Sequence, residues 1–143
     1  MSESTTDDDR LDRFARGAAA IEAVHGASGA AVVNAIEDVS PDLAHEIVAW
    51  GYGDVYSRPQ LPPRDRQLLT IGILAAMGGC EPELETHVRA ALNVGLTPEQ
   101  ILEAFLHVSV YCGFPRSINA TVVAKKIFAE RGIALGAGAG TDA

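Results

Sequence analysis

The chain has little of several features that mark common classes of protein. It contains only two cysteines, Cys80 and Cys112, which favours reduced thiols over a stabilising disulfide. No apolar run approaches the ~18 uncharged residues that a membrane-spanning helix needs. Lys and Arg number 11 against 19 acidic residues, giving a net charge of −8, whereas a nucleic-acid surface needs clustered cations. The composition therefore favours a small-molecule or protein partner over nucleic acid or a membrane.

The remaining composition is that of an ordinary globular chain. Hydrophobic residues make up 48% and charged residues 21% of the 143 positions, which suits one domain with one core. The stretch "MSESTTDDDR" is acidic where a secretory signal would be basic and then apolar, so we expect a cytoplasmic protein. Residues 1–9 and 133–143 offer little to bury. We expect them to be flexible tails around a domain over 10–132.

The apolar periodicity predicts an all-α fold of six helices. Apolar residues recur at three- and four-residue steps, and no period-2 run is sustained. The clearest boundary is "TPEQ", where Thr97 can cap a helix and Gln100 stands at the reciprocal capping-box position. The stretch "LLTIGILAAM" is apolar on nearly all sides, which predicts a central buried helix. The six helices are expected over about 9–24, 40–55, 64–77, 82–95, 97–113 and 115–130.

The stretch "GGCEPELETHVRAALNVG" places a thiol, a carboxylate and an imidazole close together. A C-x-x-C redox pair starting at Cys80 would need a second cysteine at the position of Glu83. Glu83 and His87 are four residues apart and share a helix face. A carboxylate beside an imidazole fixes its tautomer and suits it to proton transfer. The alternatives are an exposed surface pair and a Cys80 that packs as a small hydrophobe; two ligands alone do not make a zinc motif.

A second group follows the helix expected over 97–113. Glu103, His107 and Tyr111 step by four residues, with Leu106 and Val110 beside them. Such a stripe predicts a face turned to a core or an interface. A satisfied core histidine is the favoured interpretation of His107.

Two further places hold an arginine close to a helix break. Arg116 and Asn119 follow Gly113 and can point back to a cavity, or can be solvated. In "WGYGDVYSRP" an aromatic pair and Arg58 approach a proline turn. Core packing explains Trp50, whereas Arg58 needs another explanation.

Three long segments carry a resemblance to a known family, over about Arg13 to Gly132. They are "AWGYGDVYSRPQLPPRDRQLLTIGILAAMG", "ELETHVRAALNVGLTPEQILEAFLHVSVYCGFP" and "INATVVAKKIF". In order and spacing they resemble the carboxymuconolactone decarboxylase family. Its alkylhydroperoxidase D-like branch carries C-x-x-C with a histidine four residues after the second cysteine; here Glu83 replaces that cysteine and His87 keeps the histidine. The resemblance is therefore closer to the decarboxylase branch.

The resemblance implies a fold, an assembly and a reaction. The fold would be a six-helix alkylhydroperoxidase D-like bundle that forms a homo-oligomer, a trimer or hexamer, with sites at subunit contacts. The reaction would be decarboxylation of 4-carboxymuconolactone to an enol-lactone, with no cofactor and no metal. We assign His87 as proton donor, Glu83 as its orienting partner, and Arg58 or Arg116 as carboxylate anchors, because Arg binds carboxylates bidentately. Further candidates for substrate contact are Trp50, Tyr111 and His107.

Other functions stay open at the level of sequence. Relatives of this branch also act as lyases, isomerases or cyclases on natural-product intermediates. The stretch "GFPRSIN" differs from the small-residue pattern that is usual in the family after this turn, which leaves the identity of the substrate open. A thiol-dependent peroxide reductase and a non-catalytic small-molecule binder are alternatives of other classes. The missing C-x-x-C speaks against the reductase.

Overall fold

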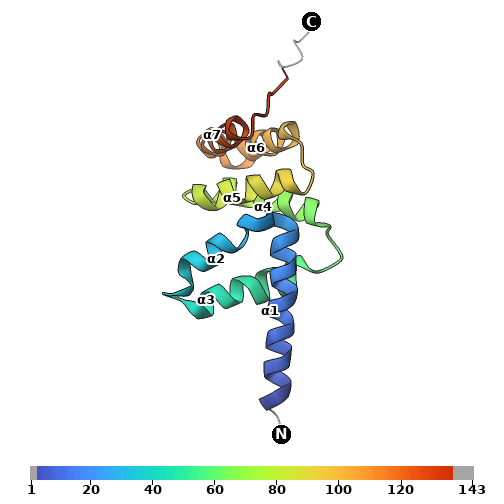
Figure 1. The fold of residues 1–143 in the computed structure, drawn as a ribbon. Helices are drawn as coiled ribbons and strands as arrows, with labels where there is room; N and C mark the ends of the chain where they lie inside the picture. The colour runs from blue at the N-terminus through green and yellow to red at the C-terminus, as the bar shows by residue number, and fades with distance from the viewer. Residues whose placement is uncertain (1–2, 137–143) are drawn as a thin grey trace, which may run out of the picture. The chain divides into compact units, whose positions relative to one another are not determined.

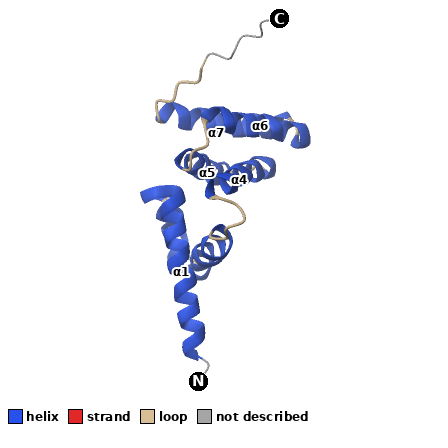
Figure 2. Ribbon diagram, turned by 90° about the vertical axis from the view of Figure 1, so that its right-hand side faces the viewer, coloured by secondary structure: helices blue, strands red, loops and turns tan. Residues whose placement is uncertain are grey.

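The structure is a computed structural model that describes residues 3–136. Over this range it holds seven α-helices, one short 3-10 turn and one π-helical segment, and no strand (Figure 2). The all-α prediction is confirmed, with one more α-helix than expected. The chain divides into two compact units, Met1–Arg66 and Gln67–Ala143, called here the first and the second unit. Among the described residues no single helix is long and apolar enough to cross a membrane, and only the pair Asp8–Ser28 and Ala30–Glu37, bent by 100°, reaches that length and composition together.

The first unit is built around one long helix. Helix α1 packs along the π-helical segment η2, and α2 packs on α3 (Figure 1). Helix α1 and η2 approach each other so closely that a Cβ atom on Gly17 would collide with the carbonyl oxygen of Val48. A Cβ atom on Gly53 would likewise collide with the carbonyl oxygen of Arg13. Arg13 also binds Asp54 of η2, with Nη2 2.6 Å from Oδ2. The elements are α1 (Glu3–His25), η1 (Gly26–Ser28), α2 (Ala30–Glu37), α3 (Pro41–Glu46) and η2 (Ile47–Tyr56).

Two features of the first unit were not predicted. The helix expected over 40–55 is divided into α3 and the π-helical η2, because a change from i→i+4 to i→i+5 hydrogen bonding leaves little trace in an apolar pattern. No helix was expected between "HGASG" and Ser40, where α2 lies, because the two glycines of that stretch mark a break and α2 has only eight residues. Helix α1 begins at Glu3, within the expected tail. The flexibility of residues 1–9 and 133–143 stays a prediction, and 137–143 lie outside the described residues.

The second unit holds the larger core. Helix α4 (Pro63–Met77) begins in the first unit, and its residues from Gln67 onward belong to the second. The helices that follow are α5 (Glu81–Asn93), α6 (Pro98–Cys112) and α7 (Phe114–Glu130). Helices α6 and α7 pack side by side, and α5 contacts both (Figure 1). The capping box of Thr97 and Gln100 is present. The core residues are Ile71, Ala75, Leu84, Val88, Ala91, Leu96, Ile101, Phe105, Val108, Ala120, Val123, Ala124, Ile127 and Phe128.

The prediction that α4 is buried on nearly all sides is wrong. Only Gln67, Ile71 and Ala75 are buried in this helix, whereas Leu69, Ile73 and Met77 are exposed, along with Leu68. An apolar run shows which side chains can be buried, but it does not distinguish burial within one chain from surface left for another molecule.

Candidate active site

His87 lies on α5 and is held by a side chain of α4. The imidazole is half-buried, and its Nδ1 lies 3.0 Å from Oε1 of Gln67, which is 0% exposed. An amide oxygen only accepts, so Nδ1–H donates to it. In the neutral ring the lone pair is then on Nε2, which is the atom that gains and loses a proton. This contact favours a neutral imidazole that carries its hydrogen on Nδ1.

Sequence reasoning missed Gln67. Its signal was available, because Gln67, Ile71 and Ala75 recur at four-residue steps and form the buried stripe of α4. A single amide on an otherwise apolar stripe needs a hydrogen-bond partner. Here His87 is one such partner.

Glu83, the orienting partner expected from sequence, lies in the first turn of α5 and is exposed. Its charge acts on the neighbouring thiol: burial, followed by the carboxylates of Glu83 and Glu81, raises the pKa of Cys80. The structure gives His87 a hydrogen bond to Gln67. The orienting role of Glu83 stays a prediction.

Cys80 has the surroundings of an unreactive thiol. Its Sγ lies 3.3 Å from the carbonyl oxygen of Leu74, to which the thiol donates. Burial and nearby carboxylates raise its pKa, whereas a reactive cysteine needs a lowered one. Both cysteines of the chain, Cys80 and Cys112, are free. This arrangement favours proton chemistry over thiol chemistry.

Arg116 brings a positive charge to the turn between α4 and α5. It lies in the first turn of α7, and its guanidinium packs on Gly78, where a Cβ atom would collide with it. Its charge opposes the effect of Glu83 on the pKa of Cys80. The structure thus brings together Arg116, Glu83 and Cys80 of the sequence-predicted set.

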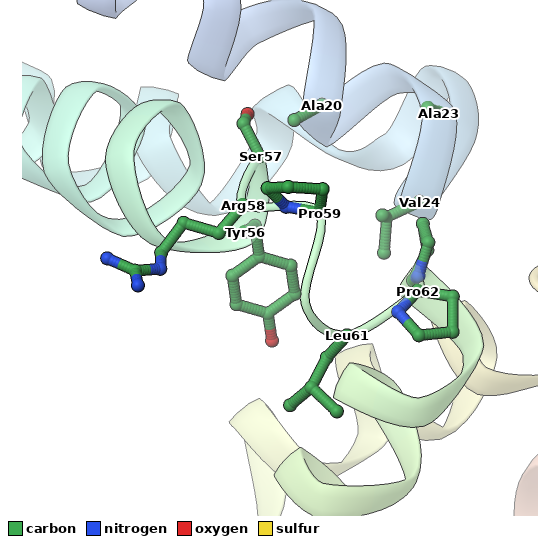
Figure 3. Close-up of a pocket in the computed structure, with 10 residues that line it drawn as sticks. Ala20, Ala23, Val24, Tyr56, Ser57, Arg58, Pro59, Leu61 and Pro62 are labelled. Atoms are coloured by element: carbon green, nitrogen blue, oxygen red, sulfur yellow. The ribbon is translucent and has the colours of Figure 1, made fainter.

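Arg58 lies in the first unit and lines a separate cavity. This cavity of about 410 Å³ is mainly apolar. The aromatic ring of Tyr56 and the rings of the proline turn line it, and the Arg58 side chain extends away from Val24 and Pro62 (Figure 3). The guanidinium of Arg66 lies 6.0 Å from the centre of the Tyr56 ring, and its Nη2 donates to the Arg58 carbonyl oxygen. The hydrogen bond from Arg66 therefore holds the backbone of this turn, whereas the side chain of Arg58 is exposed.

Four other candidates lie on the surface. Trp50 is 60% exposed, so its predicted core packing is wrong. His107 is exposed too, so the interpretation as a core histidine is also wrong; its ring lies 5.4 Å from that of Tyr111, centre to centre. In each case the helical periodicity shows which residues share a face of the helix. It does not show whether other parts of the chain bury that face. Tyr111 and Asn119 are exposed as well.

A buried histidine that the sequence did not single out lies in the first unit. His25 is 7% exposed, and its Nε2 lies 2.6 Å from the hydroxyl oxygen of Tyr52. Burial lowers the pKa of His25 and raises the pKa of Tyr52. Both shifts favour a neutral pair in which the tyrosine donates to the imidazole. The pair joins α1 to η2.

Metal ligands do not gather in the part of the chain that the structure describes. No three His, Cys, Asp or Glu side chains among these residues are placed to hold an ion together. What the described residues offer is an oriented imidazole and a separate arginine beside a thiol. These groups suit acid–base chemistry on an anionic molecule.

Comparison with known proteins agrees with this chemistry. The model of the carboxymuconolactone decarboxylase family matches residues 41–126. The chain belongs to this family. It is 40% identical over 99 residues to a 4-carboxymuconolactone decarboxylase of Acinetobacter baylyi, covering 69% of this chain and 73% of that protein.

Two other proteins are similar to this chain, and only one of them is named for an activity. A nitrosuccinic acid decarboxylase of Metarhizium robertsii is 39% identical over 98 residues, covering 66% of this chain and 68% of that protein. An uncharacterised 15.0 kDa protein of Paracoccus denitrificans is 31% identical over 99 residues, covering 68% and 74%. Two relatives are thus named decarboxylases, which supports a carboxy-lyase and decarboxylation as the general reaction.

Proposed function

We propose that the protein decarboxylates 4-carboxymuconolactone, or a closely related lactone acid, to an enol-lactone without a cofactor. The observation that carries the proposal is the half-buried His87, whose Nδ1 lies 3.0 Å from the oxygen of a fully buried amide. The 40% identity to a relative named for this reaction supports the substrate class. A small anionic substrate also agrees with the arginine beside the α4–α5 turn.

The substrate explains why no cofactor is required. Loss of CO2 breaks a C–C bond and leaves an electron pair that needs a sink. In this lactone acid the departing carboxylate is on the carbon vinylogous to the lactone carbonyl, so the pair moves through the ring C=C into a dienolate. The protein must then stabilise charge on the lactone oxygen, anchor the remaining carboxylate and protonate a ring carbon.

The chain's own residues supply groups for these tasks. In the proposal His87 delivers the proton from Nε2 to the ring carbon, and Glu83, one turn earlier on α5, supports the imidazolium. Arg116 anchors a carboxylate, because a guanidinium binds carboxylates bidentately. Arg58 is a second proposed anchor. Trp50, Tyr111 and His107 are proposed to contact substrate.

We also propose that the protein works as a homo-oligomer, a trimer or hexamer. Five large apolar side chains are exposed on α6 and α7, and we call them the α6–α7 apolar face: Leu106, Val110, Phe114, Ile118 and Val122. A cluster of this kind is typical of protein interfaces. The occupant proposed is a second copy of this chain, which would also cover Tyr111 in the last turn of α6.

The test is turnover of the purified protein with 4-carboxymuconolactone, followed by CO2 release and by loss of ultraviolet absorbance. His87→Ala should lower kcat by about 100-fold or more, the contribution typical of a general acid, with unchanged helical circular dichroism. His45→Ala, a histidine of the first unit with no proposed role, serves as the matched control. Wild-type turnover in His87→Ala would exclude the proton donor, and lactone binding without turnover would exclude the enzyme.

A different acid as substrate is the second candidate, favoured by the relative named nitrosuccinic acid decarboxylase. A panel of small lactone and non-lactone acids, each scored for CO2 release, separates the two substrate classes. The same panel would reveal a tailoring lyase, isomerase or cyclase. Cys80→Ser with unchanged turnover would remove the peroxide reductase, in agreement with the raised pKa of this thiol.

A further inference from the structure

A buried amide touches the proposed proton donor. Gln67 is the only polar or charged residue among the fully buried large side chains of the described residues. It lies on the stripe of α4 that otherwise carries Ile71 and Ala75. An apolar side chain would fill this place without the cost of desolvating an amide. The hydrogen bond to His87 offsets that cost and gives the amide a role beyond packing.

The chemistry of the amide sets what this contact can do. An imidazole with no fixed partner exchanges its proton between Nδ1 and Nε2 and rotates about its side-chain bonds. A carbonyl oxygen at 3.0 Å from Nδ1 keeps the hydrogen there and fixes the plane of the ring. An amide does so without placing a charge in the core, where an unpaired carboxylate would be costly.

We infer that Gln67 is the positioning residue of the site: it holds His87 as the Nδ1–H tautomer, so that Nε2 is the atom that takes up and delivers the proton. This assigns to a buried residue of α4 the orienting task that was expected of the exposed Glu83. The catalytic half of the inference rests on the proposed function. The tautomer half concerns the free protein alone.

Two substitutions separate positioning from packing. Gln67→Met keeps the length and removes the acceptor, whereas Gln67→Glu keeps an acceptor oxygen in the same place. Nitrogen-15 NMR of the histidines, with His87 identified by the signal lost in His87→Ala, reports the tautomer directly. We expect Nδ1–H in the wild type and in Gln67→Glu, and a shift toward Nε2–H in Gln67→Met.

The kinetic readout follows from the same geometry. Gln67→Met should lower kcat roughly 10-fold or more, comparable to the loss of activity when a metal-bound histidine loses the hydrogen bond that orients it, with KM changed less than about twofold. Gln67→Glu should restore most of that kcat. Helical circular dichroism and thermal melting show that both variants are folded.

Several outcomes would overturn the inference. A wild-type spectrum that shows His87 as the Nε2–H tautomer would overturn it. This test needs no variant of Gln67, so it remains decisive even if Gln67→Met fails to fold. Unchanged His87 signals in a folded Gln67→Met protein would do so as well, as would equal losses of kcat in both variants. A wild-type Nδ1–H signature in a protein that releases no CO2 from any acid would instead overturn the proposed function and leave the tautomer assignment in place.

Discussion

The guanidinium of Arg116 packs directly on Gly78, where a Cβ atom would collide with its Nη1. Gly78 follows the last turn of α4 with a φ of 65°, a conformation that favours glycine. Arg116 opens α7. One glycine therefore both ends a helix and leaves room for a cation contributed by another helix.

Gly78→Ala should weaken both features. An alanine at positive φ costs about 1–2 kcal/mol of the free energy of unfolding, and its methyl group displaces the guanidinium. We expect a higher KM for the acid substrate with helical circular dichroism retained. Steady-state kinetics and urea unfolding measure the two effects.

Gly79→Ala is the matched control for this prediction. Gly79 has a φ of 71°, yet a Cβ atom there would have nothing within 4 Å. It should show a similar loss of stability without the rise in KM. Equal KM values in the two variants would contradict a role for the Gly78–Arg116 contact.

Gly17→Ala should destabilise the first unit. Its methyl group would collide with the backbone carbonyl of Val48, which cannot move away as a flexible side chain can. Overpacking of this kind costs about 2 kcal/mol or more, so the urea midpoint should fall. Gly51→Ala in η2, whose nearest neighbour would be 4.0 Å away, is the control, and a similar fall there would argue against the close approach of α1 and η2.

The His25–Tyr52 pair should make stability depend on pH. Burial lowers the pKa of His25 from its ordinary value of 6.5, so below about pH 6.5 the unfolded chain binds a proton that the folded chain does not. The free energy of unfolding should therefore fall as the pH drops from about 6.5 toward the lower pKa of the folded state. It should be unaffected by this histidine at higher pH.

Urea unfolding of the wild type and of His25→Gln between pH 8 and 5 checks this prediction. The difference between the two curves cancels the other titrating groups. It should be flat above about pH 7 and should shrink below it. A difference that stays constant down to pH 5 would mean that His25 has the same pKa in the folded and in the unfolded chain, and would contradict the prediction.

The α6–α7 apolar face should control assembly. Ile118→Lys places a charge among the exposed apolar side chains of this face, so light scattering should report a smaller particle than for the wild type. Val39→Lys, at an exposed apolar position of the first unit, is the control and should leave the mass unchanged. Equal masses for the wild type and Ile118→Lys would contradict a role for this face in assembly.

Local signals in the sequence predicted most helix boundaries well. The capping box of Thr97, the glycine after α6 and the apolar stripes of α5 to α7 depend on neighbours a few residues away, which a sequence displays directly. The divided helix at Ile47 was missed because a change in backbone hydrogen bonding alters no side-chain pattern. Helix α2 was missed because its eight residues carry too little periodicity.

The candidate site shows the same division. The sequence alone determined the all-α class, the absence of a C-x-x-C pair and the place of His87 on a helix, because each follows from residue types and short spacings. Only the tertiary structure decided that Gln67, on a different helix, is the hydrogen-bond partner of His87, and that Trp50 and His107 are exposed. Contacts between helices and the covering of a face depend on how distant segments pack, and no local pattern of residues encodes that.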